Sequence, residues 1–222
     1  MAEERLIIFT RYPEPGKTKT RLIPALGAEG AAMLQRHMTE HTLNQVRELQ
    51  SDRPITAEVR YAAGSLSLMA SWLGADIVYQ PQGEGDLGTR MARSLSLAFQ
   101  DSVDRAVIIG TDCPGLNAGL MAKAFHLLHS HDLVLGPAID GGYYLLGLRY
   151  FISELFTGIN WGTATVLQQT VDSAKQLDLA VAYLPQLADV DRPEDLPVWE
   201  QIYQSREQGE QGRNIQADNP WE

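Results

Sequence analysis

Short apolar runs alternate with longer amphipathic stretches along most of the chain. The run at residues 6–9 is bounded by polar residues, as is typical of a strand buried on both faces of a parallel sheet. Further runs predict strands at residues 57–61, 77–79, 106–109, 133–135, 143–148 and 180–184. Apolar residues at a spacing of three to four predict helices at 28–49, 65–73, 89–99, 117–130 and 163–177, with a last helix after Pro193.

This order of elements predicts the fold class. Strands that alternate with helices form a mostly parallel sheet covered on both faces. We therefore expect a single α/β domain over residues 1–205, a Rossmann-like three-layer sandwich. Residues 206–222 contain few apolar residues, and we expect a disordered tail there. Ligands of such folds bind at the carboxyl ends of the strands, so the loops that follow the strands are the candidate sites.

Composition and charge narrow the possible partners. The chain has 222 residues, of which 44% are apolar, and this suits one domain with a full core. A formal net charge of −10 disfavours nucleic acid and anionic membranes as partners. No apolar run approaches membrane length, no signal-peptide pattern is visible, and Cys113 is the only cysteine. We expect a cytoplasmic protein without a disulfide.

A basic loop after the first strand is the first candidate site. Four cations lie close together in this acidic chain: Arg11, Lys17, Lys19 and Arg21. Pro15 stiffens the loop, Gly16 lets the backbone approach a ligand, and Thr20 lies between the last two cations. Such a loop can cradle a di- or triphosphate through charge-assisted hydrogen bonds, although a solvated charged loop is the alternative. A Walker A motif would need glycine where Arg11 stands.

Carboxylates after other strands are candidate metal ligands. Asp112 follows the strand at 106–109, where Mg²⁺ or Mn²⁺ could bridge it to a diphosphate. From position alone, a helix-capping role is as plausible. Asp189 and Asp191 precede a helix start, where acids are favourable even without a function.

A turn with paired glycines is the third candidate. Asp140 precedes Gly141 and Gly142, which suit close approach of the backbone to a ligand, and Asp140 could act as a base. A plain hairpin turn explains the pattern equally well. Elsewhere, His37 and His41 complete an H-x-x-E-H zinc-protease signature, but the strand and helix order is wrong for that class, and we expect surface histidines.

Five motifs carry a resemblance to known proteins: FTRYPEPGKTKTRL, QGEGDLGTRM, IGTDCPGL, GPAIDGGYYLLGL, and WGTATVL followed by DVDRPEDL. With these motifs the chain resembles the radical-SAM/selenodomain-associated transferase family. That family is glycosyltransferase-like and lies within the nucleotide-diphospho-sugar transferase superfamily of GT-A fold. A more distant similarity, in P-G-x-x-K-x-R-L and D-x-D-x-P-E-D-L, links the chain to 2-phospholactate guanylyltransferase and the molybdenum-cofactor guanylyltransferases, which transfer nucleotidyl groups.

The resemblance implies roles for particular residues. Gly16, Lys19 and Arg21 would hold the phosphates, and Asp112 with Asp189 or Asp191 would hold the divalent cation. The residues expected to line the base or ribose are Gly85, Asp86, Gly88 and Arg90. The residues expected to face the acceptor, beside Asp140, are Gly141, Gly142, Tyr143, Trp161, Gly162 and Thr163. Many GT-A enzymes carry D-x-D where this chain has a single acid, so the second ligand must come from elsewhere.

Together these features predict a metal-dependent transferase with an activated nucleotide donor and a small-molecule acceptor. Lys19 and Arg21 would neutralise charge on the leaving phosphate, and Asp140 would serve as the base. We expect a glycosyltransferase that uses a nucleoside-diphosphate sugar. A nucleotidylyltransferase that transfers NMP from an NTP to a phosphorylated acceptor is the alternative, and a non-catalytic nucleotide-binding module is the second.

Overall fold

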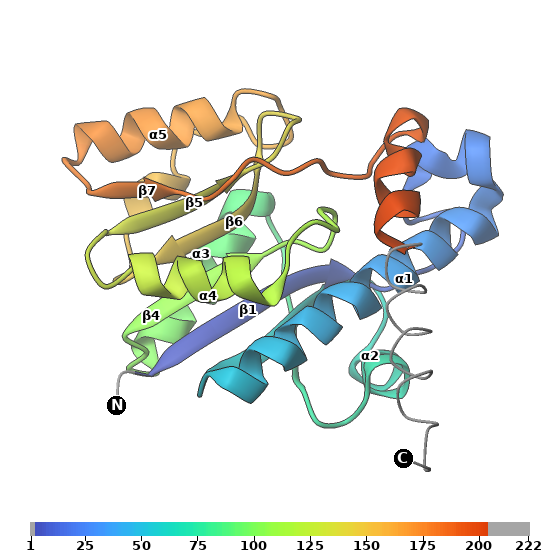
Figure 1. Ribbon diagram of the computed structural model, residues 1–222, viewed down its shortest axis with the longest axis horizontal. Coiled ribbons are helices and arrows are strands. Elements are labelled where there is room, and N and C mark those ends of the chain that lie inside the picture. The colour runs from blue at the N-terminus through green and yellow to red at the C-terminus, as the bar shows by residue number, and fades with distance from the viewer. Residues whose placement is uncertain (1–2, 204–222) are drawn as a thin grey trace, which may run out of the picture.

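A seven-stranded mixed sheet organises the part of the chain that the computed structural model describes, residues 3–203 (Figure 1). The strand order is β3-β2-β1-β4-β6-β5-β7. The strands are β1 (Glu4–Arg11), β2 (Thr56–Ala62), β3 (Val78–Pro81), β4 (Arg105–Ile109), β5 (Leu133–Pro137), β6 (Tyr143–Leu148) and β7 (Val181–Tyr183). Only β6 runs antiparallel to its neighbours, β4 and β5. The predicted α/β class, with a mostly parallel sheet, is confirmed.

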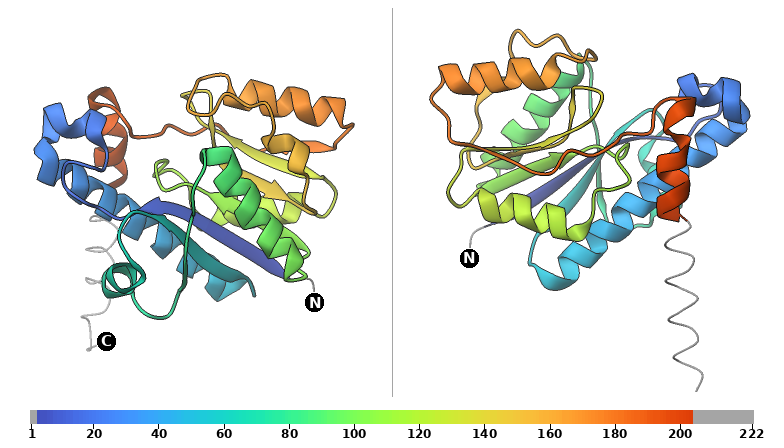
Figure 2. Two further views of the ribbon diagram at one scale, coloured as in Figure 1. Left: turned by 180° about the vertical axis from the view of Figure 1, so that it is seen from behind. Right: turned by 45° about the horizontal axis from the view of Figure 1, so that its top comes forward.

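Helices cover both faces of this sheet. They are α1 (Ile23–Asp52), α2 (Leu66–Leu73), α3 (Leu87–Gln100), α4 (Ala118–Leu127) and α5 (Val166–Gln176), and helical residues 196–203 follow a short 3-10 turn at Pro193–Asp195. Along β1, Leu6 and Ile8 pack with α1, α2 and α4, whereas Ile7 and Phe9 pack with α3 and α5. Figure 1 shows α1 and α4 on the near face, and Figure 2 shows α3 from behind. Because alternate side chains of a strand point to opposite faces, both of these layers are apolar.

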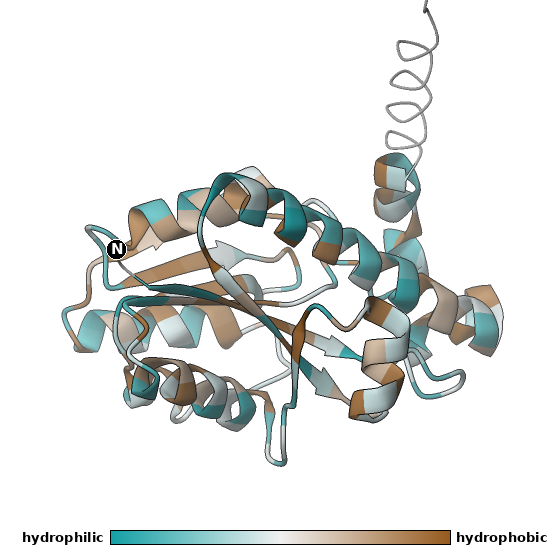
Figure 3. Ribbon diagram, turned by 90° about the horizontal axis from the view of Figure 1, so that it is seen from below, coloured by the Kyte–Doolittle hydropathy of each residue, from teal (hydrophilic) through white to brown (hydrophobic). Residues whose placement is uncertain are grey.

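The start of α1 extends beyond the sheet and packs against the C-terminal helical segment. Leu22, Met38, Val190 and Trp199 belong to this separate apolar cluster. Both segments lie side by side in Figures 1 and 2. Gly27, with φ 72° and ψ 171°, interrupts the helical geometry near the start of α1. The outer side of α1 is mainly hydrophilic, as Figure 3 shows.

Two further sequence expectations concern the membrane and the tail. No helix among the described residues is long and apolar enough to cross a membrane. The predicted tail at 206–222 lies outside the described residues.

The topology brings distant segments to one edge of the sheet. β1 and β4 are parallel neighbours, so their carboxyl ends at Arg11 and Ile109 lie at the same edge. β6 is antiparallel, so its first residue, Tyr143, lies at this edge too. The loops after β1, β4 and β5 therefore meet there.

Candidate active site

A cavity of about 510 Å³ opens at this edge. Its walls come from loops that follow β1, β3, β4 and β5, from the start of β6, and from the segment after β7. The lining includes these residues predicted from the sequence: Arg11, Arg21, Arg90, Asp112, Asp140, Gly142, Tyr143, Trp161, Gly162, Thr163, Asp189 and Asp191. The cavity therefore contains members of all three predicted groups.

Lys19 links the basic loop to the carboxylates. Its ammonium donates to Asp112 Oδ1 and to the carbonyl of Val190, both at 2.7 Å. The Val190 amide in turn donates to the Asp112 carbonyl at 2.9 Å. The Lys19 side chain is only 3% exposed and its backbone is left-handed, at φ 48°. Lys19 therefore holds three separate parts of the chain together and is not itself part of the cavity lining.

Arg21 reaches the same wall beside Lys19. Its guanidinium donates to Asp191 Oδ2 at 2.5 Å, and both side chains remain partly exposed. Asp195 accepts from the backbone amides of Asp191 and Arg192, and so fixes the turn that presents Asp191. Arg21 and Asp191 form an ion pair at the rim of the cavity.

Arg11 and Arg90 also line the cavity, away from the Lys19–Asp112 and Arg21–Asp191 ion pairs. Arg11 donates to the carbonyl of Lys17, and Arg90 donates to Gln82 Oε1 at 2.8 Å and to the Asp86 carbonyl. Gln82 is buried and donates to the carbonyls of Thr10 and Arg60, so its amide sets the orientation of Arg90. No ion pair joins Arg11 or Arg90 to a carboxylate within residues 3–203.

Several residues predicted to bind nucleotide do not line the cavity: Pro15, Gly16, Lys17, Thr20, Gly85, Asp86 and Gly88. Lys17 is exposed and pairs with Glu14. Asp86 caps α3 by accepting from the Thr89 amide, and that hydrogen bond holds the pKa of Asp86 below its usual value. The loop at 82–86 is held to α3 by Arg93, which donates to the carbonyls of Gln82 and Glu84.

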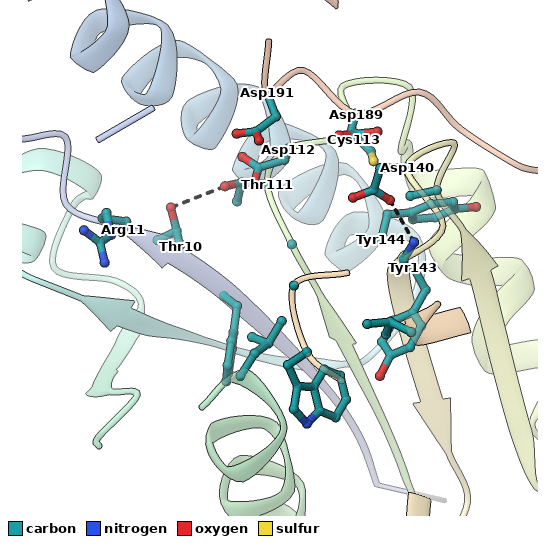
Figure 4. Close-up of a pocket in the computed structure, with 18 of the residues that line it drawn as sticks. Thr10, Arg11, Thr111, Asp112, Cys113, Asp140, Tyr143, Tyr144, Asp189 and Asp191 are labelled. Atoms are coloured by element: carbon teal, nitrogen blue, oxygen red, sulfur yellow. Dashed lines mark hydrogen bonds between the residues drawn. The ribbon is translucent and has the colours of Figure 1, made fainter. Parts of the chain in front are cut away.

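A buried polar cluster forms the floor, and sequence reasoning missed it. Gln35 Nε2 lies within 3.3 Å of the hydroxyls of Thr10, Thr39 and Thr111. Thr10 and Thr111 line the cavity between Arg11 and Asp112 (Figure 4). Thr111 immediately precedes Asp112 in the motif IGTDCPGL, and this position was the available signal. Gln35 lies in the middle of a helix, where only the tertiary structure reveals its role.

Aromatic and acidic residues form the opposite wall. Asp140 Oδ1 accepts from the Gly142 amide at 2.8 Å. The rings of Tyr143 and Trp161 meet edge to face, with centroids 6.5 Å apart. A Cβ atom on Gly88 would lie 2.2 Å from the Trp161 ring, so glycine is required where the indole crosses the start of α3. Gly141 does not line the cavity, but its backbone has φ 89° and accommodates the turn.

Burial and charge control the protonation of this wall. Burial, and then the charge of Asp140, raises the pKa of Asp189. Burial together with the nearby Asp189 and Asp112 raises the pKa of the Cys113 thiol well above its usual range. Burial also raises the pKa of Tyr144 to about 12 and that of Tyr143 further. The thiol and both phenols therefore stay protonated at neutral pH, and the carboxylates are the available bases.

The carboxylates of the cavity are the right chemical type for a divalent cation, but two of them already form ion pairs. Hard cations such as Mg²⁺ and Mn²⁺ take oxygen ligands, and Asp112, Asp189 and Asp191 all reach the cavity. Asp112 and Asp191, however, already have cationic partners in Lys19 and Arg21. Within residues 3–203 no group of three or more His, Cys, Asp or Glu side chains is arranged to hold a metal ion. A cation would have to compete with Lys19 and Arg21 for two of the three acids.

The H-x-x-E-H histidines have structural roles. His41 is buried, so the expectation of a surface histidine was wrong for this residue. Its Nε2 lies 2.9 Å from the Pro114 carbonyl, in the loop after Asp112. His37 stacks on Tyr203.

The seven-stranded α/β fold with a cavity at its carboxyl edge is similar to solved structures of the nucleotide-diphospho-sugar transferase superfamily, which has the GT-A fold. The chain belongs to the DUF2064 family, described as "Uncharacterized protein conserved in bacteria", whose model matches residues 45–163. No curated protein matches the chain. A protein from Desulfovibrio desulfuricans G20, provisionally named a nucleotide-diphospho-sugar transferase, is 38% identical, with a TM-score of 0.81 over 86% of this chain and 84% of that one.

More remote structures share only the fold. Glucosyl-3-phosphoglycerate synthase from Mycobacterium tuberculosis, in complex with Mn²⁺, UDP and phosphoglyceric acid, is 13% identical, with a TM-score of 0.55 over 87% of this chain and 72% of that one. CMP:2-keto-3-deoxy-manno-octonic acid synthetase, complexed with CTP, is 9% identical, with a TM-score of 0.56 over 92% and 100%. One of these proteins is bound to UDP and the other to CTP, and a shared fold does not by itself identify the reaction that this chain catalyses.

Proposed function

We propose that the protein is a divalent-cation-dependent glycosyltransferase that uses a nucleoside-diphosphate sugar and a small-molecule acceptor. The observation that carries this proposal is the convergence of Arg11, Arg21 and Arg90 with Asp112 and a second acid in one cavity at the carboxyl edge. A diphosphate needs several cationic donors at once, and this cavity supplies them. The choice of a nucleoside-diphosphate sugar as the donor rests on the resemblance to the radical-SAM/selenodomain-associated transferases.

The proposed roles follow from the contacts. Arg11 and Arg90 would bind the phosphates, with Gly16, Pro15, Lys17 and Thr20 shaping the loop. Asp112, with Asp189 or Asp191, would hold Mg²⁺ or Mn²⁺, which supplies Lewis-acid stabilisation of the departing diphosphate. Lys19 keeps Asp112 in place, and Arg21 would neutralise charge on the leaving group. Gly85, Asp86 and Gly88 would position the loop beside the base or ribose.

Other observations support the same reading. The structurally similar synthase from M. tuberculosis is bound to Mn²⁺ and UDP, which is the combination proposed here. A nucleotidylyltransferase is the second candidate, favoured by the D-x-D-x-P-E-D-L motif and by the likeness to a CTP-bound synthetase. A non-catalytic nucleotide-binding module would have no use for Asp140 in the cavity. A cytoplasmic location remains a prediction from the sequence.

The test is a thermal-shift screen with nucleoside diphosphates, triphosphates and diphosphate sugars, with and without Mn²⁺, followed by product analysis. Release of a nucleoside diphosphate supports glycosyl transfer, and release of pyrophosphate from an NTP supports the second candidate. We expect Arg11→Ala to weaken nucleotide binding about tenfold or more, as for the loss of a charge-assisted hydrogen bond. The control is Arg36→Ala, at an exposed arginine of α1 that pairs with Glu40.

The cation is tested separately. Asp189→Asn should remove the Mn²⁺-dependent part of the stabilisation by nucleotide, whereas Asp172→Asn, an exposed acid of α5, should not. Stabilisation by nucleotide that does not depend on Mn²⁺ would contradict the cation assignment. If no nucleotide stabilises the protein, both enzymatic candidates fail.

A further inference from the structure

The charges of the cavity are segregated along the chain. All cationic residues that line it precede residue 110, and they are Arg11, Arg21 and Arg90. All four carboxylates that line it follow residue 110, and they are Asp112, Asp140, Asp189 and Asp191. Lysine, arginine and histidine are absent from the lining that residues 110–203 contribute. The cavity thus has one basic side and one acidic side, as Figure 4 shows for Arg11 and Asp140.

Ion pairing sharpens this division. Asp112 is paired with Lys19, and Asp191 with Arg21, at the boundary between the two sides. The charges left without an ion-pair partner among the described residues are Arg11 and Arg90 on one side and Asp140 and Asp189 on the other. Phosphates are attracted to the first side and repelled from the second.

Aromatic residues link the acidic side to the start of α3. Tyr143 and Trp161 line the cavity and brace one another edge to face, and Trp161 packs over Gly88 at the start of α3, the helix that carries Arg90. Leu87 and Val166 extend the apolar part of this lining. A flat apolar surface beside a hydrogen-bonding carboxylate suits a compound with C–H faces and hydroxyl groups.

Asp140 is placed to act on such a hydroxyl. Its Oδ1 accepts from the Gly142 amide, which orients the carboxylate, and no hydrogen bond within residues 3–203 involves Oδ2. An alcohol needs a base to become a nucleophile, whereas a phosphate monoester is already anionic and needs cations around it. The acidic side supplies a base and no cationic side chain, and the divalent cation proposed above would be engaged by the diphosphate of the donor.

We propose, building on the function proposed above, that the acceptor is an unphosphorylated hydroxyl compound of the sugar or polyol class, seated against Trp161 with its reacting hydroxyl on Asp140. The hydroxyl oxygen attacks the anomeric carbon of the donor and forms the new C–O bond. The bond from that carbon to the β-phosphate oxygen breaks, and its electron pair leaves with the nucleoside diphosphate. The hydroxyl proton passes to Asp140. A phosphorylated acceptor is rejected, because its charge would face Asp140 in a part of the lining that contains no cationic side chain.

The experiment uses matched pairs of compounds that differ by one phosphate. The protein is saturated with the nucleoside diphosphate that stabilises it most and with Mg²⁺, which is diamagnetic and leaves the NMR signals of the ligands sharp. Binding of glucose and glucose 6-phosphate, of glycerol and glycerol 3-phosphate, and of mannose and mannose 6-phosphate is then measured by saturation-transfer NMR. We expect the neutral member of at least one pair to bind at least tenfold more tightly than its phosphorylated partner.

Variants connect this preference to the acidic side. Asp140→Asn removes one of the two unpaired charges and should move the preference toward parity, a result that a purely structural role would not give. Trp161→Ala should abolish binding of the neutral member. Asp172→Asn, the remote control acid, should leave the preference unchanged.

The outcomes separate this proposal from the one on which it rests. Tighter binding of the phosphorylated members, or no binding of any neutral member by nucleotide-loaded protein, overturns the acceptor class and leaves the donor assignment standing. A preference that Asp140→Asn does not alter also overturns it. Failure of every nucleotide to stabilise the protein overturns both.

Discussion

Lys19 and Asp112 are 93 positions apart in the sequence, and their side chains are joined by a hydrogen bond of 2.7 Å between Nζ and Oδ1. The lysine is almost fully buried, while the aspartate is 55% exposed to the cavity. The contact brings the basic loop and a proposed cation ligand together. It also makes Lys19 a structural residue, and this changes what its removal should do.

Lys19→Ala should lower the free energy of unfolding by about 1 to 3 kcal/mol, because it removes two charge-assisted hydrogen bonds and leaves the Val190 carbonyl without its lysine partner. Urea unfolding measures this loss. Lys17→Ala, two residues away but 67% exposed, should change stability by less than about 0.5 kcal/mol. Equal effects of the two variants would contradict the buried role of Lys19.

Gly88→Ala should destabilise the protein by about 1 to 3 kcal/mol, because the new methyl group would collide with the Trp161 ring. Alanine usually stabilises a helix relative to glycine, so the sign is diagnostic. Gly119 is likewise the second residue of a helix, and a Cβ there would meet only Asn117 Oδ1, at 3.3 Å. Gly119→Ala should therefore be neutral or stabilising in thermal unfolding, and a shift in tryptophan emission should accompany Gly88→Ala alone.

Arg90→Ala should weaken nucleotide binding about tenfold or more, because Arg90 lines the cavity without a carboxylate partner. Arg93, one turn further along α3, holds the loop at 82–86 but does not line the cavity. Arg93→Ala should thus reduce the melting temperature and alter affinity much less. Titration calorimetry beside thermal unfolding separates the two roles, and an equal loss of affinity in both variants would refute the assignment of Arg90.

Asp86→Ala should destabilise α3 in a pH-dependent manner. The capping hydrogen bond lowers the pKa of Asp86 in the folded protein, so its stabilisation is present above the unfolded-state pKa and is lost as the pH falls through the lower, folded-state value. The difference between wild type and Asp86→Ala should therefore shrink in acid. Asn117 caps α4 with an uncharged amide, and Asn117→Ala should cost about 1 kcal/mol at every pH. Parallel pH profiles for the two variants would argue against the charge effect.

The sequence predicted most of the fold because the two faces of the sheet demand apolar residues at regular positions. Each predicted strand lies within two residues of an observed one, and Asn117 caps its helix as its position indicated. The beginning of α1 was missed because Gly27 breaks the helical geometry there and Pro24 opens the helix. Local pattern is a weaker guide where a helix extends beyond the sheet.

The cavity was predictable in outline only. Arg11, Asp112 and Asp140 follow strands, so the carboxyl-edge rule located them. Lys19 donates to the carbonyl of Val190, 171 positions away in the sequence, and Gly88 is needed because the indole of Trp161 packs against it. Contacts between such distant segments leave no periodic signal, and neither did the Gln35 cluster beneath the cavity.

The hydrogen bonds that join Val190 to Lys19 and to Asp112 limit how far the protein could be shortened and still function. The stretch matched by the family model stops at residue 163, and it starts after Lys19 and Arg21. A shortened protein cut to those limits would keep β2 to β6 with Asp112 and Asp140, yet it would lack β1, Lys19 and Arg21, and also Val190 and Asp191, which bond to those two cations. A shortened protein should retain at least residues 4–199, so that the basic loop can still bond to Val190 and Asp191 and Leu22 can still pack in the cluster with Trp199.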